Sequence, residues 1–177
     1  MPDITIQYYK IPFGELILGS FDDKLCLCDW RYRKMRSEID NRILSGLNDE
    51  FEEGETPVIK ETKAQIDAYL KKELTQFDIP LLLVGSDFQK AVWNELLKIP
   101  YGKSSTYLEL SRKMGNEKAI RAVAAANGAN AISIIVPCHR IIGSDGKLVG
   151  YAGGLNAKRK LLLLEGAVRQ PEQLKLF

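Results

Sequence analysis

The spacing of apolar residues changes near residue 85, and this change restricts the chain to a fold with two parts of different character. Before that point, residues 3–11, 14–21 and 24–30 are rich in β-branched and aromatic residues and are separated by short turn sequences, PFG and DD. Segments of this kind predict strands, and the short turns predict that the three strands form an antiparallel meander.

Helical spacing follows the strands. Residues 36–47 and 56–74 place apolar side chains three or four positions apart, and the Thr-Pro pair that opens the second segment is typical of a helix start. We expect an acidic loop between these helices, at 49–55, and a last strand at 77–85. Residues 1–84 therefore predict a small domain that mixes helices and strands.

From Ser86 onward the sequence is mainly helical. Residues 86–99 predict a helix with Ser86 or Asp87 as its N-cap and with Phe88 among the residues of its buried face. A glycine-rich stretch, GSDGKLVGYAGGL, predicts a loop. A final helix is expected to begin after it, with Asn156 as N-cap.

Two short helices, predicted at 106–114 and 117–128, have the spacing of a helix-turn-helix. The second helix is rich in alanine and carries one long cation, Arg121. Such a slim surface suits either close approach to a partner or tight packing inside the protein. We assign residues 85–167 to a second domain and residues 168–177 to a C-terminal tail.

Charge is distributed unevenly along the chain. Residues 1–100 contain 13 Lys and Arg against 18 Asp and Glu, a net charge of −5, whereas residues 101–177 contain 12 against 5, a net charge of +7. A basic part joined to an acidic part indicates that the basic part faces an anionic partner. Chance clustering on a solvated surface is the alternative.

Cysteine and histidine are scarce. Cys26, Cys28, Cys138 and a single histidine, His139, are too few for a disulfide framework or a closed metal site. No stretch is long and apolar enough to span a bilayer, and the first residues do not read as a secretory signal. We therefore expect a cytoplasmic protein, nucleoid-associated if the source is bacterial, that holds no metal.

The segment IIVPCHRIIG, residues 134–143, places a thiol, the only imidazole and a cation between two apolar runs. A free thiol has a pKa of about 8.5, and a neighbouring imidazole or cation favours the reactive thiolate. By itself the pattern also fits a buried, inert cysteine beside a hydrogen-bonded histidine, because adjacency in sequence does not establish contact.

Three longer stretches, IPYGKSSTYLEL, RAVAAANGANAISIIVPCHRIIG and GYAGGLNAKRKLLLLEG, together resemble the O6-alkylguanine-DNA alkyltransferase family. The resemblance covers roughly residues 86–166 and is highly specific around PCHR, whereas the N-terminal part matches only in size and rough pattern. It implies an α+β fold class. A small ribonuclease-H-like α/β domain would be followed by a mainly α, winged-helix-like domain that binds DNA and holds the active site.

Members of this family move the alkyl group of O6-alkylguanine irreversibly to their own cysteine, without a cofactor. The resemblance implies that Cys138 is the acceptor and that His139 is its base, acting through a water molecule. Glu165 would hydrogen-bond the imidazole, and Tyr151 would donate a proton to the departing oxygen. Asn130 would tie the helix-turn-helix to the active-site segment. O4-alkylthymine is a second candidate substrate.

The partner implied by the resemblance is double-stranded DNA, bound by a monomer in the minor groove with little sequence preference. Because the target base lies inside the duplex, it must be flipped out. Arg121 would take its place in the stack, and Tyr107 would crowd the phosphate and contact the base edge. The expected DNA-binding residues are Arg121, Tyr107, Ala122, Ala125 and Gly128. The expected residues of the substrate pocket are Pro137, Ile141, Ala152, Gly153 and Lys158.

Other functions fit parts of the pattern. A cysteine-dependent hydrolase would use Cys138, but the sequence specifies no acyl pocket. A lesion-binding module that cannot repair would lack the cysteine, and a transcription regulator would need a second, sensing domain. The tail residues Gln173–Phe177 resemble a bacterial sliding-clamp-binding pentapeptide, with folding back onto the protein's own surface as the alternative.

Overall fold

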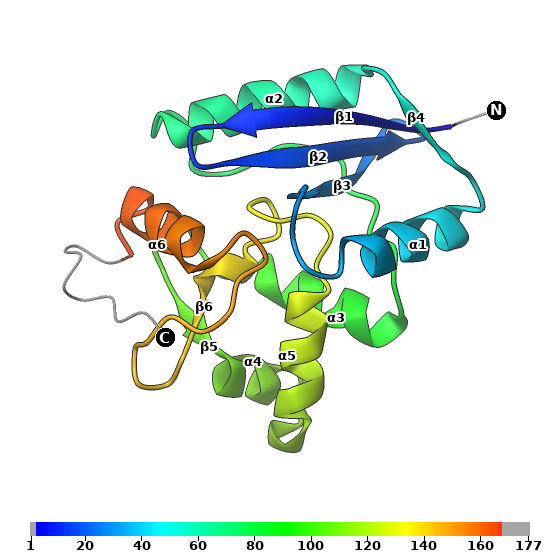
Figure 1. Ribbon diagram of the computed structural model, residues 1–177. Helices are drawn as coiled ribbons and strands as arrows, with labels where there is room; N and C mark the ends of the chain where they lie inside the picture. The colour runs from blue at the N-terminus through cyan, green and yellow to red at the C-terminus, as the bar shows by residue number, and fades with distance from the viewer. Residues whose placement is uncertain (1–2, 168–177) are drawn as a thin grey trace. The chain divides into compact units, whose positions relative to one another are not determined.

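The computed structural model describes residues 3–167, which form two compact units divided between Gly85 and Ser86. The first unit combines a mainly antiparallel sheet with two helices and the second unit is mainly helical, so the fold class is α+β, as predicted (Figure 1). No helix within the described residues has the length and apolar character needed to cross a membrane. The predicted clamp-binding segment, Gln173–Phe177, lies outside the described residues.

The first unit is built on a four-stranded sheet. Its strands are β1 (Ile4–Ile11), β2 (Gly14–Phe21), β3 (Lys24–Trp30) and β4 (Phe51–Glu53), in the spatial order β3-β2-β1-β4. The pairs β1–β2 and β2–β3 are antiparallel, so the predicted three-stranded meander is confirmed.

Two predictions for this unit were wrong. Part of the expected acidic loop is the strand β4, which pairs in parallel with β1. A strand is possible here because Phe51 is half-buried while Glu52 and Glu53 of the same strand face solvent. The expected last strand is reduced to a single bridge between Leu81 and Leu25. Pro80 has no N–H to donate, which limits a ladder at this edge.

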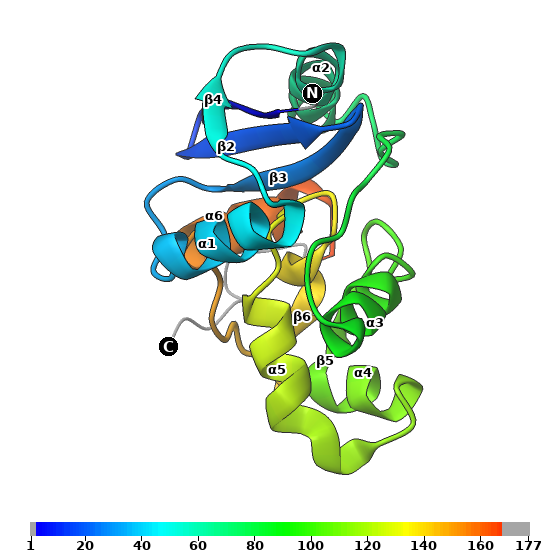
Figure 2. The same ribbon diagram turned by 90° about the vertical axis from the view of Figure 1, so that its right-hand side faces the viewer.

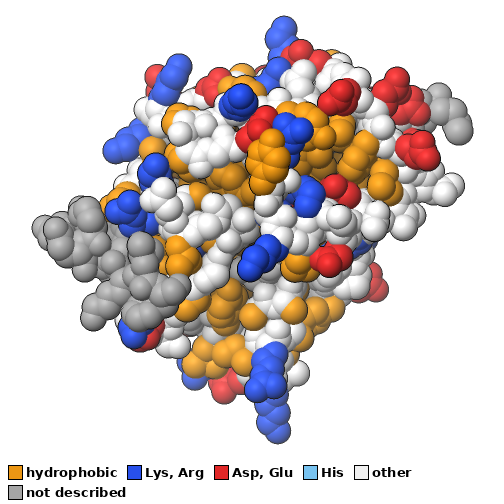
Figure 3. Space-filling model, in the orientation of Figure 1, with side chains coloured by type: hydrophobic (Ala, Val, Ile, Leu, Met, Phe, Trp, Pro, Cys, Tyr) orange, Lys and Arg blue, Asp and Glu red, His pale blue; other side chains and the backbone are white. Residues whose placement is uncertain are grey.

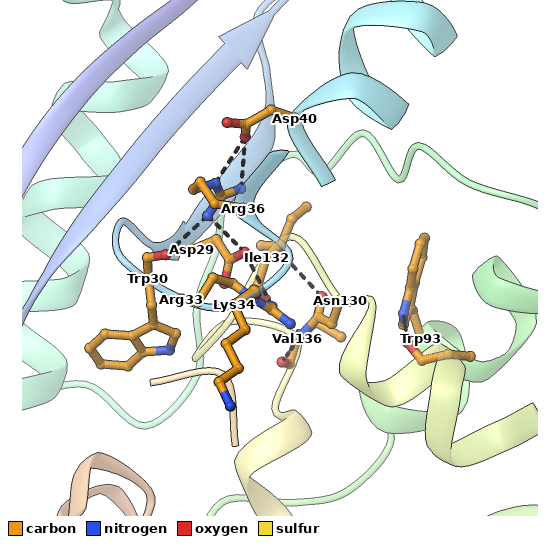
Figure 4. Close-up of polar contacts among 11 residues, drawn as sticks. Asp29, Trp30, Arg33, Lys34, Arg36, Asp40, Trp93, Asn130, Ile132 and Val136 are labelled. Atoms are coloured by element: carbon orange, nitrogen blue, oxygen red, sulfur yellow. Dashed lines mark hydrogen bonds and ion pairs between the residues drawn. The ribbon is translucent and has the colours of Figure 1, made fainter. Parts of the chain in front are cut away.

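Two helices complete the first unit. The helix α1 (Arg36–Leu47) has no side-chain cap, but Arg36 donates to Asp29 at 3.0 Å and Asp40 at 2.9 Å at its start (Figure 4). The helix α2 (Pro57–Leu70) is capped by the Thr56 side chain and contacts β2 and β3 of the sheet. It runs alongside the strands in Figure 1 and is seen nearly end-on in Figure 2. It ends four residues earlier than predicted, and the chain then turns through a residue with positive φ.

The second unit begins with α3 (Asp87–Leu96). Its N-cap is Ser86 and not Asp87, the two candidates that the sequence offered. The Gln89 side chain completes a capping box with Ser86. Phe88 was predicted to be buried but is 39% exposed. Trp93 occupies the interior instead, and its indole N–H donates to the carbonyl of Ala126 at 2.8 Å, so the helix turns its face toward α5.

The predicted helix-turn-helix consists of α4 (Tyr107–Lys113), a 3₁₀ turn (Glu117–Ala119) and α5 (Ile120–Gly128). The strand β5 (Ser105–Thr106) precedes it and pairs in parallel with β6 (Ile141–Ile142). This short ladder brings the start of the helix-turn-helix next to the segment that follows the Pro-Cys-His-Arg sequence.

The last helix, α6 (Leu155–Leu164), begins earlier than predicted. Its N-cap is Gly154, whose φ of 91° suits glycine, and Asn156 lies inside the first turn and accepts a hydrogen bond from Arg159. In Figure 1 the β5–β6 ladder lies between α6 and the group formed by α3, α4 and α5.

Candidate active site

Cys138 lies at the start of a 3₁₀ turn (Cys138–Arg140) and is 4% exposed. Pro137, with φ −82° and ψ 62°, forms an inverse γ-turn in which the Cys138 N–H donates to the Val136 carbonyl at 2.8 Å. Proline suits this position because its ring holds φ in the required range. This turn ends the apolar run at Val136, and the chain changes direction immediately before Cys138.

A second tight turn precedes the first. Ile134 has a φ of 71° and is 1% exposed, and the N–H of Ile135 donates to the Ser133 carbonyl at 2.8 Å. A β-branched residue at positive φ is strained, and this kind of γ-turn is rare. Such strain persists only where the surroundings hold it, and it is frequent at functional sites.

The side chain of Asn130 helps to hold the strained segment around Ile134 in place. Its side-chain amide donates to the carbonyls of Val136 at 2.9 Å and Ile132 at 3.3 Å, and its carbonyl accepts from the Ile132 N–H at 2.9 Å (Figure 4). Asn130 is 2% exposed and lies two residues after the end of α5, behind the C-cap residue Ala129. Its side chain therefore connects the end of the helix-turn-helix to the segment that leads into Cys138.

His139, Arg140 and Glu165 form a buried hydrogen-bonded group. Nε2 of His139 lies 2.8 Å from Oε2 of Glu165. Arg140 donates to the same carboxylate through Nε at 2.9 Å and Nη2 at 3.0 Å. A bidentate guanidinium keeps a carboxylate ionised and accepting, so Nε2 of His139 carries its proton.

The other imidazole nitrogen, Nδ1, is buried and has no hydrogen-bond partner among the described residues. Burial lowers the pKa of His139, against the opposing effect of Glu165. The imidazole is therefore neutral at physiological pH, with Nδ1 as its free basic atom. A neutral imidazole held in one tautomer is what a general base requires.

The hydrogen-bond partners of Arg140 differ from those that its position next to Cys138 and His139 suggested. The sequence placed this cation near the thiol, but its guanidinium is occupied by Glu165 and by the Ile99 carbonyl, to which Nη1 donates at 2.6 Å. It also lies 5.9 Å from the ring centroid of Tyr101. Sequence reasoning considered Arg140 only as a cation near the thiol and missed its pairing with Glu165, for which the available signal was that a buried carboxylate needs a cationic partner.

Tyr151 and Lys158 belong to the loop and helix that follow the site. The Tyr151 and His139 rings meet edge to face, with centroids 6.4 Å apart. Lys158 is fully buried and donates to the carbonyls of Val149 at 2.9 Å and Gly150 at 3.2 Å. Burial lowers the pKa of Lys158 to about 8, against an opposing interaction with Cys138. The lysine thus holds the Tyr151 loop and lies near the thiol.

The remaining predicted pocket residues occupy two environments. Pro137 and Ile141 are buried on either side of the 3₁₀ turn, whereas Ala152 and Gly153 are half-buried in the loop before α6. Tyr107 is the first residue of α4. Burial raises its pKa, and so does its interaction with Cys138, which places the phenol in the neighbourhood of the thiol.

The predicted DNA-binding residues of α5 share one exposed face. Arg121, Ala122, Ala125 and Gly128 are all exposed, whereas Val123 and Ala126 are buried. The alanine-rich helix is therefore packed on one side and slim on the other. Figure 3 shows Lys or Arg side chains projecting from the α4–α5 end of this unit beside small and apolar ones.

Within residues 3–167 no group of three His, Cys, Asp or Glu side chains is arranged to hold a metal ion. Cys26 and Cys28 are buried in β3. Burial raises the pKa of Cys26 to about 12 and also raises that of Cys28, so neither thiol is activated.

Comparison with known proteins covers both units. The family model described as 6-O-methylguanine DNA methyltransferase, ribonuclease-like domain, matches residues 4–83, and its DNA binding domain matches residues 87–167. A methylated-DNA–protein-cysteine methyltransferase of Methanosarcina acetivorans is 43% identical over 164 residues, which cover 91% of this chain and 99% of that protein. One from Mycobacterium bovis is 55% identical over 113 residues, covering 64% and 68%.

Solved structures agree with these matches. The crystal structure of Mycobacterium tuberculosis OGT in complex with DNA is similar with a TM-score of 0.79 at 39% identity, covering 92% of this chain and 93% of that one. The O6-methylguanine-DNA methyltransferase of Pyrococcus kodakaraensis, at 21% identity and a TM-score of 0.66, shares the fold.

Proposed function

Because the chain belongs to the 6-O-methylguanine DNA methyltransferase family, we propose that it repairs alkylated DNA directly, by moving the alkyl group from O6 of guanine to the sulfur of Cys138. The observation that carries this proposal is the buried contact of 2.8 Å between His139 and Glu165, which leaves a neutral basic nitrogen on the residue next to the thiol. O4-alkylthymine is a second candidate substrate.

The transfer balances without a cofactor. The Cys138 proton passes through a water molecule to Nδ1 of His139, and the thiolate attacks the alkyl carbon. A carbon–sulfur bond forms as the bond between that carbon and O6 breaks. Tyr151 donates its phenolic proton to the departing oxygen and regains one from the imidazolium. The thioether formed on Cys138 is not hydrolysed in neutral aqueous solution, so each chain transfers one alkyl group only.

The test is intact mass after incubation with a duplex that contains one O6-methylguanine. We expect one added methyl group, about 14 Da, on a peptide that contains Cys138, at one equivalent per chain. A chelator should leave the reaction unchanged. Continued turnover beyond one equivalent would instead favour a hydrolase, which releases its intermediate.

The exposed face of α5 is the proposed contact with DNA. We place it in the minor groove, where small side chains permit close approach and contacts to the backbone carry no sequence code. Binding should therefore show little sequence preference and should weaken strongly with salt. One monomer suffices, because every residue proposed for the chemistry and for the DNA contact comes from the second unit.

Arg121 is proposed to fill the place vacated by the flipped base. Arg121→Ala is expected to slow transfer from duplex DNA by about ten- to a hundredfold, because unstacking a base costs a few kcal/mol. Reaction with free O6-benzylguanine needs no flipping and should change less than about twofold. Single-turnover rates on both substrates check this. Lys118→Ala, which removes an exposed cation of the same unit, serves as the control. Equal losses on the two substrates would place Arg121 in the chemistry or in the fold.

We also propose that the tail docks on a bacterial sliding clamp through Gln173–Phe177, in which two leucines and a terminal phenylalanine are apolar anchors. A labelled peptide of residues 168–177 should bind the clamp of the source organism in fluorescence anisotropy. Leu176→Ala and Phe177→Ala should each weaken that binding. Binding that is indifferent to both substitutions would exclude this role.

A further inference from the structure

Arg140 lies beside the site, but the transfer described above does not use it. Its side chain is 9% exposed, and those of its neighbours Glu165 and His139 are fully buried. Its Nε and Nη2 donate to the two oxygens of the Glu165 carboxylate at 2.9 and 3.0 Å, and Oε2 of that carboxylate also lies 2.8 Å from Nε2 of His139. A guanidinium and an imidazole therefore share one buried carboxylate.

The turn that follows α3 holds this pair in place. The Ile99 carbonyl accepts from Nη1 of Arg140 at 2.6 Å, so all three nitrogens of the guanidinium donate hydrogen bonds. The Tyr101 hydroxyl donates to the carbonyl of Leu164, the residue before Glu165, at 3.3 Å. A guanidinium that is fixed in this way also fixes the plane of the carboxylate that it binds.

The charges of this buried group decide whether the imidazole can act as a base. A guanidinium stays protonated throughout the pH range in which proteins fold, so Arg140 already balances Glu165. A proton on Nδ1 of His139 would add a second positive charge to a group with one carboxylate, and an unpaired buried charge is costly. Without Arg140, the same proton would neutralise the buried carboxylate, and the imidazolium would become the favoured form.

The ionisable side chains next to His139 come from its own turn, from α6 and its C-cap, and from the loop before α6: Cys138, Arg140, Lys158, Glu165 and Tyr151. Burial has the largest effect and lowers the pKa of His139, Glu165 raises that pKa, and the two cations lower it. Lys158 is not the cation that pairs with Glu165, since its amine donates to two backbone carbonyls of the Tyr151 loop. The charge balance at Glu165 therefore depends on Arg140.

We propose that Arg140 is a positioning residue for the transfer, which balances the charge of Glu165 so that His139 stays uncharged and its Nδ1 stays free to take the Cys138 proton. This inference rests on the proposed function. The fork of the guanidinium orients the carboxylate, and its charge keeps the base from being protonated in advance. In the unmodified chain, His139 should consequently be neutral at pH 6, where an ordinary histidine is mostly protonated.

The first test is nitrogen-15 NMR of the full chain, in which every imidazole signal belongs to His139 because the chain has one histidine. At pH 6 the unmodified chain should show a neutral imidazole with its proton on Nε2. Arg140→Gln removes the charge but keeps an amide donor for Glu165, and it should show an imidazolium at that pH. Arg140→Lys keeps a cation and should leave the imidazole neutral. An imidazolium in the unmodified chain or in Arg140→Lys, or a neutral imidazole in folded Arg140→Gln, would overturn the inference.

The second test is the pH dependence of transfer from free O6-benzylguanine. At pH 6, Arg140→Gln should react at least about tenfold more slowly than the unmodified chain, since loss of an adjacent charge moves an acid–base equilibrium by about ten- to a thousandfold. This deficit should shrink as the pH rises, because the imidazolium then loses its proton. A deficit that is the same at pH 6 and pH 9 would indicate a structural role only and would contradict the proposal.

Arg112→Gln is the matched control for both tests, because it removes the cation of an exposed pair with Glu117 and should change neither readout. The unmodified chain is measured in parallel. Its failure to take up the benzyl group would count against the proposed function, whereas the NMR comparison would still test the charge balance at His139.

Discussion

Cys138→Ala is expected to abolish alkyl transfer completely, with no gain of mass on any incubation with O6-methylguanine duplex. The reason is chemical, since the sulfur forms the new bond and alanine offers no atom that could replace it. The substitution removes one buried heavy atom, so folding should be affected only slightly, by about 1 kcal/mol. Lesion binding should survive, because the proposed DNA face on α5 is untouched.

The chain supplies its own controls for this experiment. Cys26→Ala and Cys28→Ala remove two other buried thiols, whose pKa values are raised by burial, and both should keep full stoichiometry of one alkyl group per chain. Binding of the lesion duplex by the Cys138→Ala chain is measured by anisotropy, with an undamaged duplex as reference. Removal of the methyl group by that chain would mean that another residue is the acceptor.

Sequence reasoning succeeded where the neighbours of a residue in the chain decide its environment. The bounds of β1, β2 and β3 follow from local composition and turns, and the start of α3 follows from the cap at Ser86. The motif around Cys138 identified the family because it is long and specific. These features need no knowledge of distant contacts.

Sequence reasoning failed where contacts between residues far apart in the chain determine a residue's conformation or environment. Ile134 adopts a positive φ that its own side chain disfavours, and only packing and the Asn130 bonds hold it there. Arg140 finds its carboxylate 25 positions away, at Glu165, so its sequence neighbours were misleading. Phe88 has the spacing of a buried residue, but Trp93 takes the interior and determines the face that α3 presents.

Glu165→Gln is expected to slow transfer by about a thousandfold or more, by analogy with the effect of an amide in place of the orienting carboxylate in catalytic triads. The carboxylate now accepts from Nε2 of His139. A glutamine amide would donate to Nε2 instead and shift the imidazole proton to Nδ1. His139 would remain neutral, because burial already lowers its pKa, but the basic nitrogen would face the wrong way.

Stability and rate must be separated for this variant, because Glu165 also pairs with Arg140. Breaking a buried pair of this kind costs about 3–5 kcal/mol when one partner is removed, and an amide oxygen that still accepts from Arg140 should reduce that loss. The rate is therefore measured at a temperature where circular dichroism shows the variant to be folded. Glu95→Gln, which breaks a more exposed pair with Lys98, should change neither stability nor rate appreciably. A folded Glu165→Gln chain that transfers alkyl at the rate of the unmodified protein would show that the carboxylate does not set the tautomer of His139.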